Sequence, residues 1–344
     1  MMTRTLARSA IAAVGAALLM TSATVFAQSE QELYDKAKTE RKVSLYTDIQ
    51  VEVVQAVIEG FKKKYPGVDV DFYRGDSGQV TQRFETESAA GRHDADVVTV
   101  TDRQSKTFYA KGFTVPYKSR NAERLPAELR GKDDAWTTYG TVQLGIAWNS
   151  DLVKDADAPK TWDDFLQPKW AGKLGIQDPL QGGGAGIWVA TMYGLWGEQK
   201  WSDYMKRLGA QKPRYARYLE VRDMLAGGEI QAQLVAYPAF TQPVIDKGAP
   251  IKWALIDPAL FTGLTLNLSK NAPRPNAGKL FIDYVISEEG QKILADKAQV
   301  PALASALPAV YQPITKVKLV PQAHELEAQR ADFFKQKMQE YFVR

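Results

Sequence analysis

The chain has 344 residues, of which 45% are hydrophobic and 24% are charged, with a formal net charge of +4 and no cysteine. The first 27 residues hold two arginines and no acid, so the net charge of the chain without them is +4 − 2 = +2. Because this charge is close to neutral, we expect neither nucleic acid nor an anionic membrane surface as a partner. The lack of cysteine excludes disulfides, thiolate nucleophiles, thiolate metal sites and a lipidated cysteine.

The N-terminus has the pattern of a secretory signal peptide over residues 1–27. Arg4 and Arg8 precede an apolar run from Ala10 to Met20, and small residues follow as far as Ala27. The run is too short to span a bilayer, and no later stretch is both long and apolar enough. We therefore expect a protein exported to the periplasm through a cleavable signal, without a lipid anchor or membrane insertion, and monomeric.

The first part of the mature chain alternates strands with helices. Strands are predicted at 43–46, 68–73 and 97–100, and helices from 53 to near 65 and at 80–90. This order predicts parallel strands with right-handed crossovers, and hence an α/β fold. Ligands bind such sheets beyond the carboxyl ends of the strands. The candidate ligand residues in the polar loops predicted there are Asp48, Gln50, Ser77, Thr101 and Arg103, although ordinary solvated loops would have a similar composition.

The character of the chain changes in its second part, which suggests a second domain beginning near Tyr139. An extended stretch at 141–148 is followed by a segment rich in proline, tryptophan and glycine at 159–175. Further strands are predicted at 174–176, 230–235 and 264–268, and helices at 218–225, at 277–285 and from about 325 onward.

A glycine-rich stretch runs from Asp178 to Gly186 and leads into a predicted helix. It holds four glycines within five residues. The first turn of a helix has unpaired N–H groups and a partial positive charge, so it can hold an anion by its backbone. The amides would come from Gly183, Gly184, Ala185 and Gly186. The spacing fits neither a P-loop nor Gly-x-Gly-x-x-Gly, and a flexible surface connection explains it equally well.

Several stretches together resemble one protein family. They lie at 61–68, 93–98, 162–173, 178–179 and 281–291. In these the chain is similar to the periplasmic solute-binding proteins of ABC importers, in the branch that includes the ferric-ion-binding proteins and their organic-ligand relatives. The resemblance implies the type II periplasmic binding protein fold, with two Rossmann-like lobes joined by two crossover strands. It implies lobe I at 28–138 plus 263–344, lobe II at 139–262, and a membrane permease and an ATPase as partners.

The same resemblance bears on the ligand. Where iron binders carry a histidine, an acid and a tyrosine pair, this chain carries Gln50, Thr101 and Pro238-Ala239, which are poor ferric ligands. A shifted site using Tyr237 and Asp102 stays open. We therefore predict no metal and no cofactor.

In place of a metal site, we expect the glycine loop to hold the acidic end of a small organic anion. This solute would be a phosphate ester, a phosphonate or a carboxylate, with Tyr218 and Tyr237 beside it. Ferric-ion binding is the alternative. A periplasmic hydrolase is less favoured, because no Gly-x-Ser-x-Gly occurs and both histidines, His93 and His324, are predicted to lie at the surface.

Overall fold

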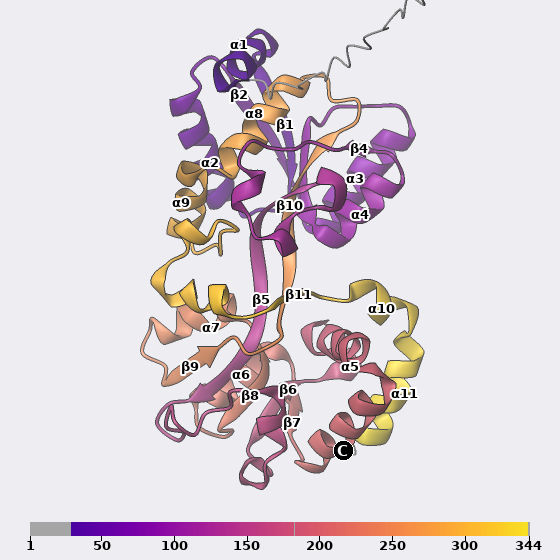
Figure 1. The fold of residues 1–344 in the computed structure, drawn as a ribbon, viewed down its shortest axis with the longest axis vertical. Coiled ribbons are helices and arrows are strands. Elements are labelled where there is room, and N and C mark those ends of the chain that lie inside the picture. Colours follow the sequence, from indigo (N-terminus) through magenta and orange to yellow (C-terminus); the bar gives the residue numbers. More distant parts are fainter. Residues whose placement is uncertain (1–28, 182, 343–344) are drawn as a thin grey trace, which may run out of the picture.

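The computed structural model describes residues 29–181 and 183–342, so the predicted signal peptide and Gly182 lie outside the described residues. Two α/β lobes are stacked along the long axis of the molecule and are joined by two long strands, β5 (Thr137–Asn149) and β10 (Ala259–Ser269) (Figure 1). The predicted fold class is thus confirmed. None of the described helices is long and apolar enough to cross a membrane.

Lobe I is built on a sheet with the strand order β2-β1-β3-β10-β5. Its strands besides β5 and β10 are β1 (Lys42–Thr47), β2 (Asp69–Arg74), β3 (Val97–Thr101) and the short β4 (Thr114–Val115). β1 pairs in parallel with both β2 and β3, as the alternating pattern predicts. The helices of this lobe are α1 (Glu30–Glu40), α2 (Val51–Lys64), α3 (Ser77–Ala89), α4 (Asp102–Ala110), α8 (Pro275–Val285) and α9 (Glu288–Asp296).

Lobe II continues the sheet from β5 in the order β5-β8-β6-β7, and β9 pairs with β5 as well. Its strands are β6 (Leu174–Gln177), β7 (Arg214–Ala216), β8 (Ala232–Ala236) and β9 (Ile251–Ala254), and its helices are α5 (Gly183–Ala210), α6 (Tyr218–Ala226) and α7 (Pro238–Ile245). Short 3-10 turns connect elements in both lobes at 122–124, 127–129, 132–134, 162–166, 168–170, 179–181, 304–306 and 309–316.

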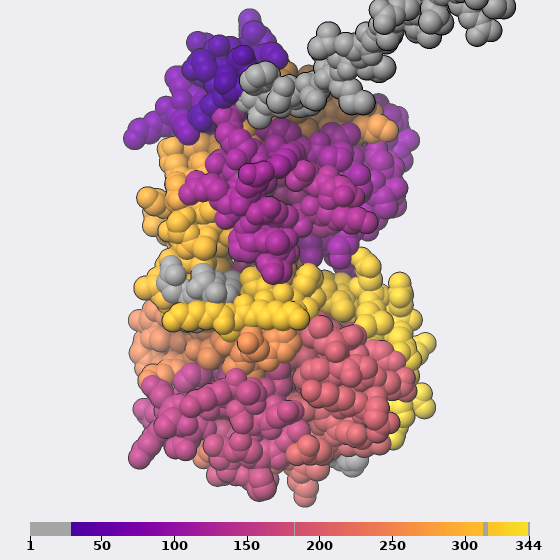
Figure 2. Space-filling view, viewed as in Figure 1, coloured from indigo at the N-terminus to yellow at the C-terminus, as the bar shows by residue number. Residues whose placement is uncertain are grey.

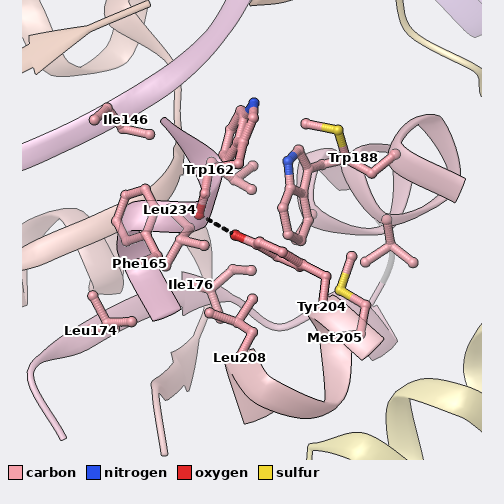
Figure 3. Close-up of a cluster of buried hydrophobic side chains, with 14 of the residues drawn as sticks. Ile146, Trp162, Phe165, Leu174, Ile176, Trp188, Tyr204, Met205, Leu208 and Leu234 are labelled. Carbon is pink, nitrogen blue, oxygen red and sulfur yellow. Dashed lines mark hydrogen bonds between the residues drawn. The ribbon is translucent and has the colours of Figure 1, made fainter. Parts of the chain in front are cut away.

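Tryptophan and tyrosine side chains form much of the core of lobe II (Figure 3). Trp188 of α5 is fully buried with its ring 5.4 Å from that of Trp162. The buried Tyr204 hydroxyl donates to the carbonyl of Trp162 at 2.7 Å, so its polar end is satisfied inside the core. This packing holds the first half of α5 in place, and with it the glycine loop.

The C-terminal helices α10 (His324–Gln329) and α11 (Ala331–Tyr341) pack against α5. Phe334 and Met338 are buried in the core of lobe II, and the Phe334 ring lies 5.8 Å from that of Trp201. The chain reaches this position through β11 (Leu319–Pro321), which pairs in parallel with β10. The predicted division places 263–344 in lobe I, but the packing places the chain from His324 onward with lobe II, as Figure 1 shows.

Two predicted loops of lobe I are the first turns of helices. The polar loop predicted to contain Ser77 leads into α3 at that residue, because Asp76 and Gln79 form a reciprocal capping box with both hydrogen bonds at 2.9 Å. Likewise, Asp102 and Arg103 begin α4 directly after β3 rather than forming a loop.

Candidate ligand-binding site

The start of α5 presents backbone N–H groups that find no acceptor among the described residues. Gly183 has φ +71°, which glycine adopts without strain, and the helix proper follows it. Gly184 and Ala185 are buried, yet within residues 29–181 and 183–342 no acceptor is found for their amides. Buried N–H groups are rarely left unpaired, and the helix dipole adds positive potential here. The turn therefore has the properties of an anion site.

Tyr237 lies directly against this turn. A Cβ on Gly184 would be 2.1 Å from the Tyr237 hydroxyl oxygen, so any larger residue would have to displace the phenol from its present position. The side chain of Gln177 approaches in the same way, because a Cβ on Gly183 would be 2.6 Å from its Nε2. Two side-chain donors thus meet the free amides at the start of the helix.

The position of Gln177 was not predicted, although the sequence contains a signal for it. Gln177 is the last residue of β6 and precedes the glycine stretch by only a few residues. A polar residue at the carboxyl end of a strand that feeds an anion-binding turn belongs among the candidates.

Tyr237 is held by Tyr218 at the start of α6. The Tyr218 hydroxyl accepts a hydrogen bond from the Tyr237 amide at 2.9 Å, and the two rings lie 5.3 Å apart. Phe240, which is 53% exposed, packs on both rings at 5.8 Å and was also missed by the sequence reasoning. The predicted pair Tyr218 and Tyr237 therefore lies together, with Tyr218 supporting Tyr237.

Burial, followed by the neighbouring Tyr218, raises the pKa of Tyr237 to about 12. The phenol is therefore protonated at neutral pH and acts as a hydrogen-bond donor. One protein carboxylate already lies close to the turn, since Glu327 Oε1 would be 3.7 Å from a Cβ on Gly186. The start of α5 accordingly suits an anionic acceptor.

In lobe I, three predicted residues are connected by hydrogen bonds at the carboxyl ends of β1 and β3 and at the start of α3. The Asp48 carboxylate accepts from the Thr99 hydroxyl at 3.2 Å. Gln104 joins Ser77 to Thr101: its amide donates to the Ser77 hydroxyl at 3.2 Å, and its carbonyl accepts from Thr101. Burial raises the pKa of Asp48, and hydrogen bonds including those to Thr99 and Ser77 oppose this rise.

The other two lobe I candidates lie outside this cluster. Gln50 is exposed at the N-cap of α2 and makes no capping hydrogen bond through its side chain. Arg103 is exposed in the first turn of α4, where it lines a small pocket shared with α10. His324 lines the same pocket and is partly exposed. His93 is partly exposed and contacts Asn271.

The two residues of the possible shifted metal site have different surroundings. Tyr237 lies against Gly184 in lobe II, whereas Asp102 lines the pocket between α4 and α10. In the described part of the chain, no group of three or more histidine, aspartate or glutamate side chains could hold a metal ion.

The comparison with known families is decisive for the class of protein. The family model described as bacterial extracellular solute-binding protein matches residues 47–292. The chain belongs to this family. It is accordingly a solute-binding protein of an ABC importer, and it has the type II periplasmic binding protein fold.

The chain is also similar to individual proteins. An uncharacterized protein from Haemophilus influenzae is 25% identical over 304 residues, which is 83% of this chain and 85% of that protein. The solved Bordetella ferric binding protein has a TM-score of 0.73 at 20% identity, covering 87% of this chain and 98% of its own. The periplasmic binding protein AfuA from Actinobacillus pleuropneumoniae, with exogenous fructose-6-phosphate bound, has a TM-score of 0.61 at 23% identity, covering 88% and 98%. At such identities the two solved structures establish the fold alone.

Proposed function

We propose that this solute-binding protein captures a small organic anion in the cleft between its lobes. The observation that carries the proposal is the meeting of donors at the start of α5. There the unpaired amides of Gly184 and Ala185 lie beside the Tyr237 hydroxyl and the Gln177 amide. A phosphate, phosphonate or carboxylate group offers acceptor oxygens for these donors.

Ferric iron is the other candidate ligand, because one solved relative is a ferric binding protein while another holds fructose-6-phosphate. The side chains of this chain favour the organic anion. A ferric site needs several anionic oxygen or imidazole ligands, and among residues 29–181 and 183–342 no group of three or more histidine, aspartate or glutamate side chains could hold a metal ion. The position of the tyrosine pair of iron binders holds Pro238 and Ala239.

The lobe I cluster would complete the site when the lobes close. Asp48, Ser77 and Thr101 present hydroxyl and carboxylate groups that suit the less acidic part of a solute. Closure would be a shift in population towards a state with higher ligand affinity, which the permease then recognises. We further propose that the protein acts as a monomer in the periplasm and needs no cofactor.

Isothermal titration calorimetry tests the proposal directly. The purified mature protein is titrated with phosphate esters, phosphonates and carboxylates, and separately with Fe(III) citrate while visible absorbance is recorded. We expect heat from at least one organic anion and no new absorbance band with iron. Tight Fe(III) binding with a tyrosinate colour, and no binding of any organic anion, would overturn the proposal.

A further inference from the structure

A second polar pocket lies between α4 and the segment that leads into α10. Its volume is about 160 Å³, and it is lined by Asp102, Arg103 and Lys106 on one side and by residues 322–326 on the other. Figure 1 shows α4 at the lower edge of lobe I and α10 facing it, and in Figure 2 the C-terminal segment lies across the waist of the molecule. Since α10 packs on α5, the pocket has one wall on each lobe.

Two buried side chains in this pocket have polar atoms without a partner in the described residues. Asp102 is 8% exposed, and its Oδ1 accepts no hydrogen bond. Gln322 is 6% exposed, and its Nε2 donates none, although its Oε1 lies 3.1 Å from the Thr262 hydroxyl. Leaving such groups unpaired costs free energy, so a partner from outside the protein is expected.

The pair of unsatisfied atoms specifies the chemistry of that partner. Oδ1 of Asp102 needs a donor, while Nε2 of Gln322 needs an acceptor. A hydroxyl group is both at once, because it carries one O–H donor and two lone pairs. A phosphate or carboxylate oxygen would satisfy Gln322 but would be repelled by the Asp102 carboxylate.

The charges around the pocket balance one another. Arg103 and Lys106 supply two positive charges, and Asp102 and Glu325 supply two negative ones, with Lys106 and Glu325 at 3.8 Å. Burial, followed by the nearby Arg103 and Lys106, lowers the pKa of His324, so this side chain is neutral at neutral pH. A pocket with no net charge and many hydrogen-bonding groups suits a neutral hydroxylated group better than a second ion.

The pocket also lies within reach of the anion site. Asp102 follows Thr101, a member of the lobe I cluster. On the other wall, the Ala323 amide donates to the Thr191 hydroxyl at 2.9 Å. Thr191 is seven residues beyond Gly184 in α5, which corresponds to a rise of about 10 Å. A solute of several carbon atoms could therefore contact both places.

We infer that the pocket between α4 and α10 is a subsite for the hydroxylated part of the solute, which makes the ligand a polyhydroxylated organic anion. The inference rests on the proposed function, since the acidic end of the same molecule would occupy the start of α5. Asp102 and Gln322 would hold one hydroxyl between them, and Arg103 and His324 could contact its neighbours.

Matched pairs of solutes test this inference. Glycerol 3-phosphate is compared with propyl phosphate, and hexose 6-phosphates with hexyl phosphate, by calorimetry on the mature protein. We expect the hydroxylated member of at least one pair to bind about 10-fold or more tightly, which corresponds to one good hydrogen-bonded group. In Asp102→Ala and in Gln322→Ala that ratio should fall towards one, because each variant removes a hydrogen-bonding atom of the hydroxyl contact while the anion site stays intact.

Asp296→Ala serves as the matched control, because it makes the same exchange at an exposed position at the end of α9. It should leave the ratio unchanged, and thermal melts show whether each variant is folded. Equal affinity within every pair, or a ratio that survives in both pocket variants, would overturn the subsite and leave the proposed function standing.

The remaining outcomes separate the two proposals. If no anion binds, free glycerol and neutral hexoses are titrated next. Binding of a neutral polyol that Asp102→Ala abolishes would support the subsite and refute the anion proposal. No binding of either class would refute both.

Discussion

Replacing Gly184 by alanine should weaken anion binding through Tyr237. The backbone of Gly184 is not in the left-handed region, so alanine is allowed there. Its Cβ, however, would lie 2.1 Å from the Tyr237 hydroxyl oxygen and 2.7 Å from two ring carbons. Tyr237 must therefore move. Overpacking of this kind costs about 1–3 kcal/mol of stability. Loss of one hydrogen bond to a charged ligand, about 1.5–3 kcal/mol, raises Kd about 10- to 100-fold.

The assay is calorimetric titration of Gly184→Ala, Tyr237→Phe and the double variant with the best anion found for the wild type. If alanine acts only by displacing the phenol, the double variant should bind no more weakly than Gly184→Ala alone, so the two effects are not additive. Gly194→Ala is the matched control, because Gly194 is an exposed glycine in the same helix whose Cβ would meet only the end of the Leu326 side chain, at 3.3 Å.

Two results would refute this reasoning. Unchanged affinity in Gly184→Ala, with a normal thermal melt, would show that the start of α5 is not in contact with the ligand. Fully additive losses in the double variant would show that Tyr237 and Gly184 act independently, contrary to their close contact.

Four further predictions follow from the same geometry. The affinity for a phosphate monoester should stay constant from about pH 8 to about pH 10.5, because Tyr237 with a pKa of about 12 keeps its proton in this range. A loss of affinity in calorimetry with a midpoint near pH 10, about the pKa of an ordinary phenol, would contradict this prediction. Burial raises the pKa of Asp102, so the ionised carboxylate lowers the stability of the protein above that pKa, and this cost disappears as the pH falls through the pKa. Asp102→Asn should therefore raise the free energy of unfolding at neutral pH but not in acid. The reverse pH trend in urea titrations would contradict this prediction. Phe334→Ala should lower the free energy of unfolding by about 3–5 kcal/mol while leaving anion affinity unchanged, and no loss of stability would mean that α11 is not docked on lobe II. Gln177→Ala should raise the Kd for the anion about 10-fold, because it removes one side-chain donor beside the start of α5. The control Gln199→Ala, at an exposed position of the same helix, should leave the Kd unchanged. Equal Kd values for the two variants in calorimetry would show that Gln177 does not contact the ligand.

The strands and helices of lobe I could be predicted because their signals are local. The period of apolar residues in Val51–Lys64 and the run Val97–Thr101 each identify one element, and alternation of strand and helix implies parallel pairing. At the start of α3, where the prediction fails, capping sets the boundary of the helix. Asp76 and Gln79 extend α3 backwards by a reciprocal pair of bonds, which turn propensity alone does not reveal.

The C-terminal helices could not be placed from their sequence. An amphipathic pattern shows that α11 buries one face, but it does not identify the surface that the face covers. The pattern of α11 is compatible with packing on either lobe I or lobe II. The tertiary structure chooses lobe II, because Phe334 and Met338 join the aromatic cluster around Trp201.

The sequence by itself determined the glycine turn, the helix after it and the family, because free amides at a helix start and a family resemblance spread along the chain are properties of the linear order. Only the tertiary structure decided what surrounds that turn. Tyr237 and Gln177 reach it from the ends of two neighbouring strands, and Asp102 meets Gln322 from opposite lobes. Such contacts join residues far apart in the chain, so their geometry depends on how the elements pack rather than on any local pattern.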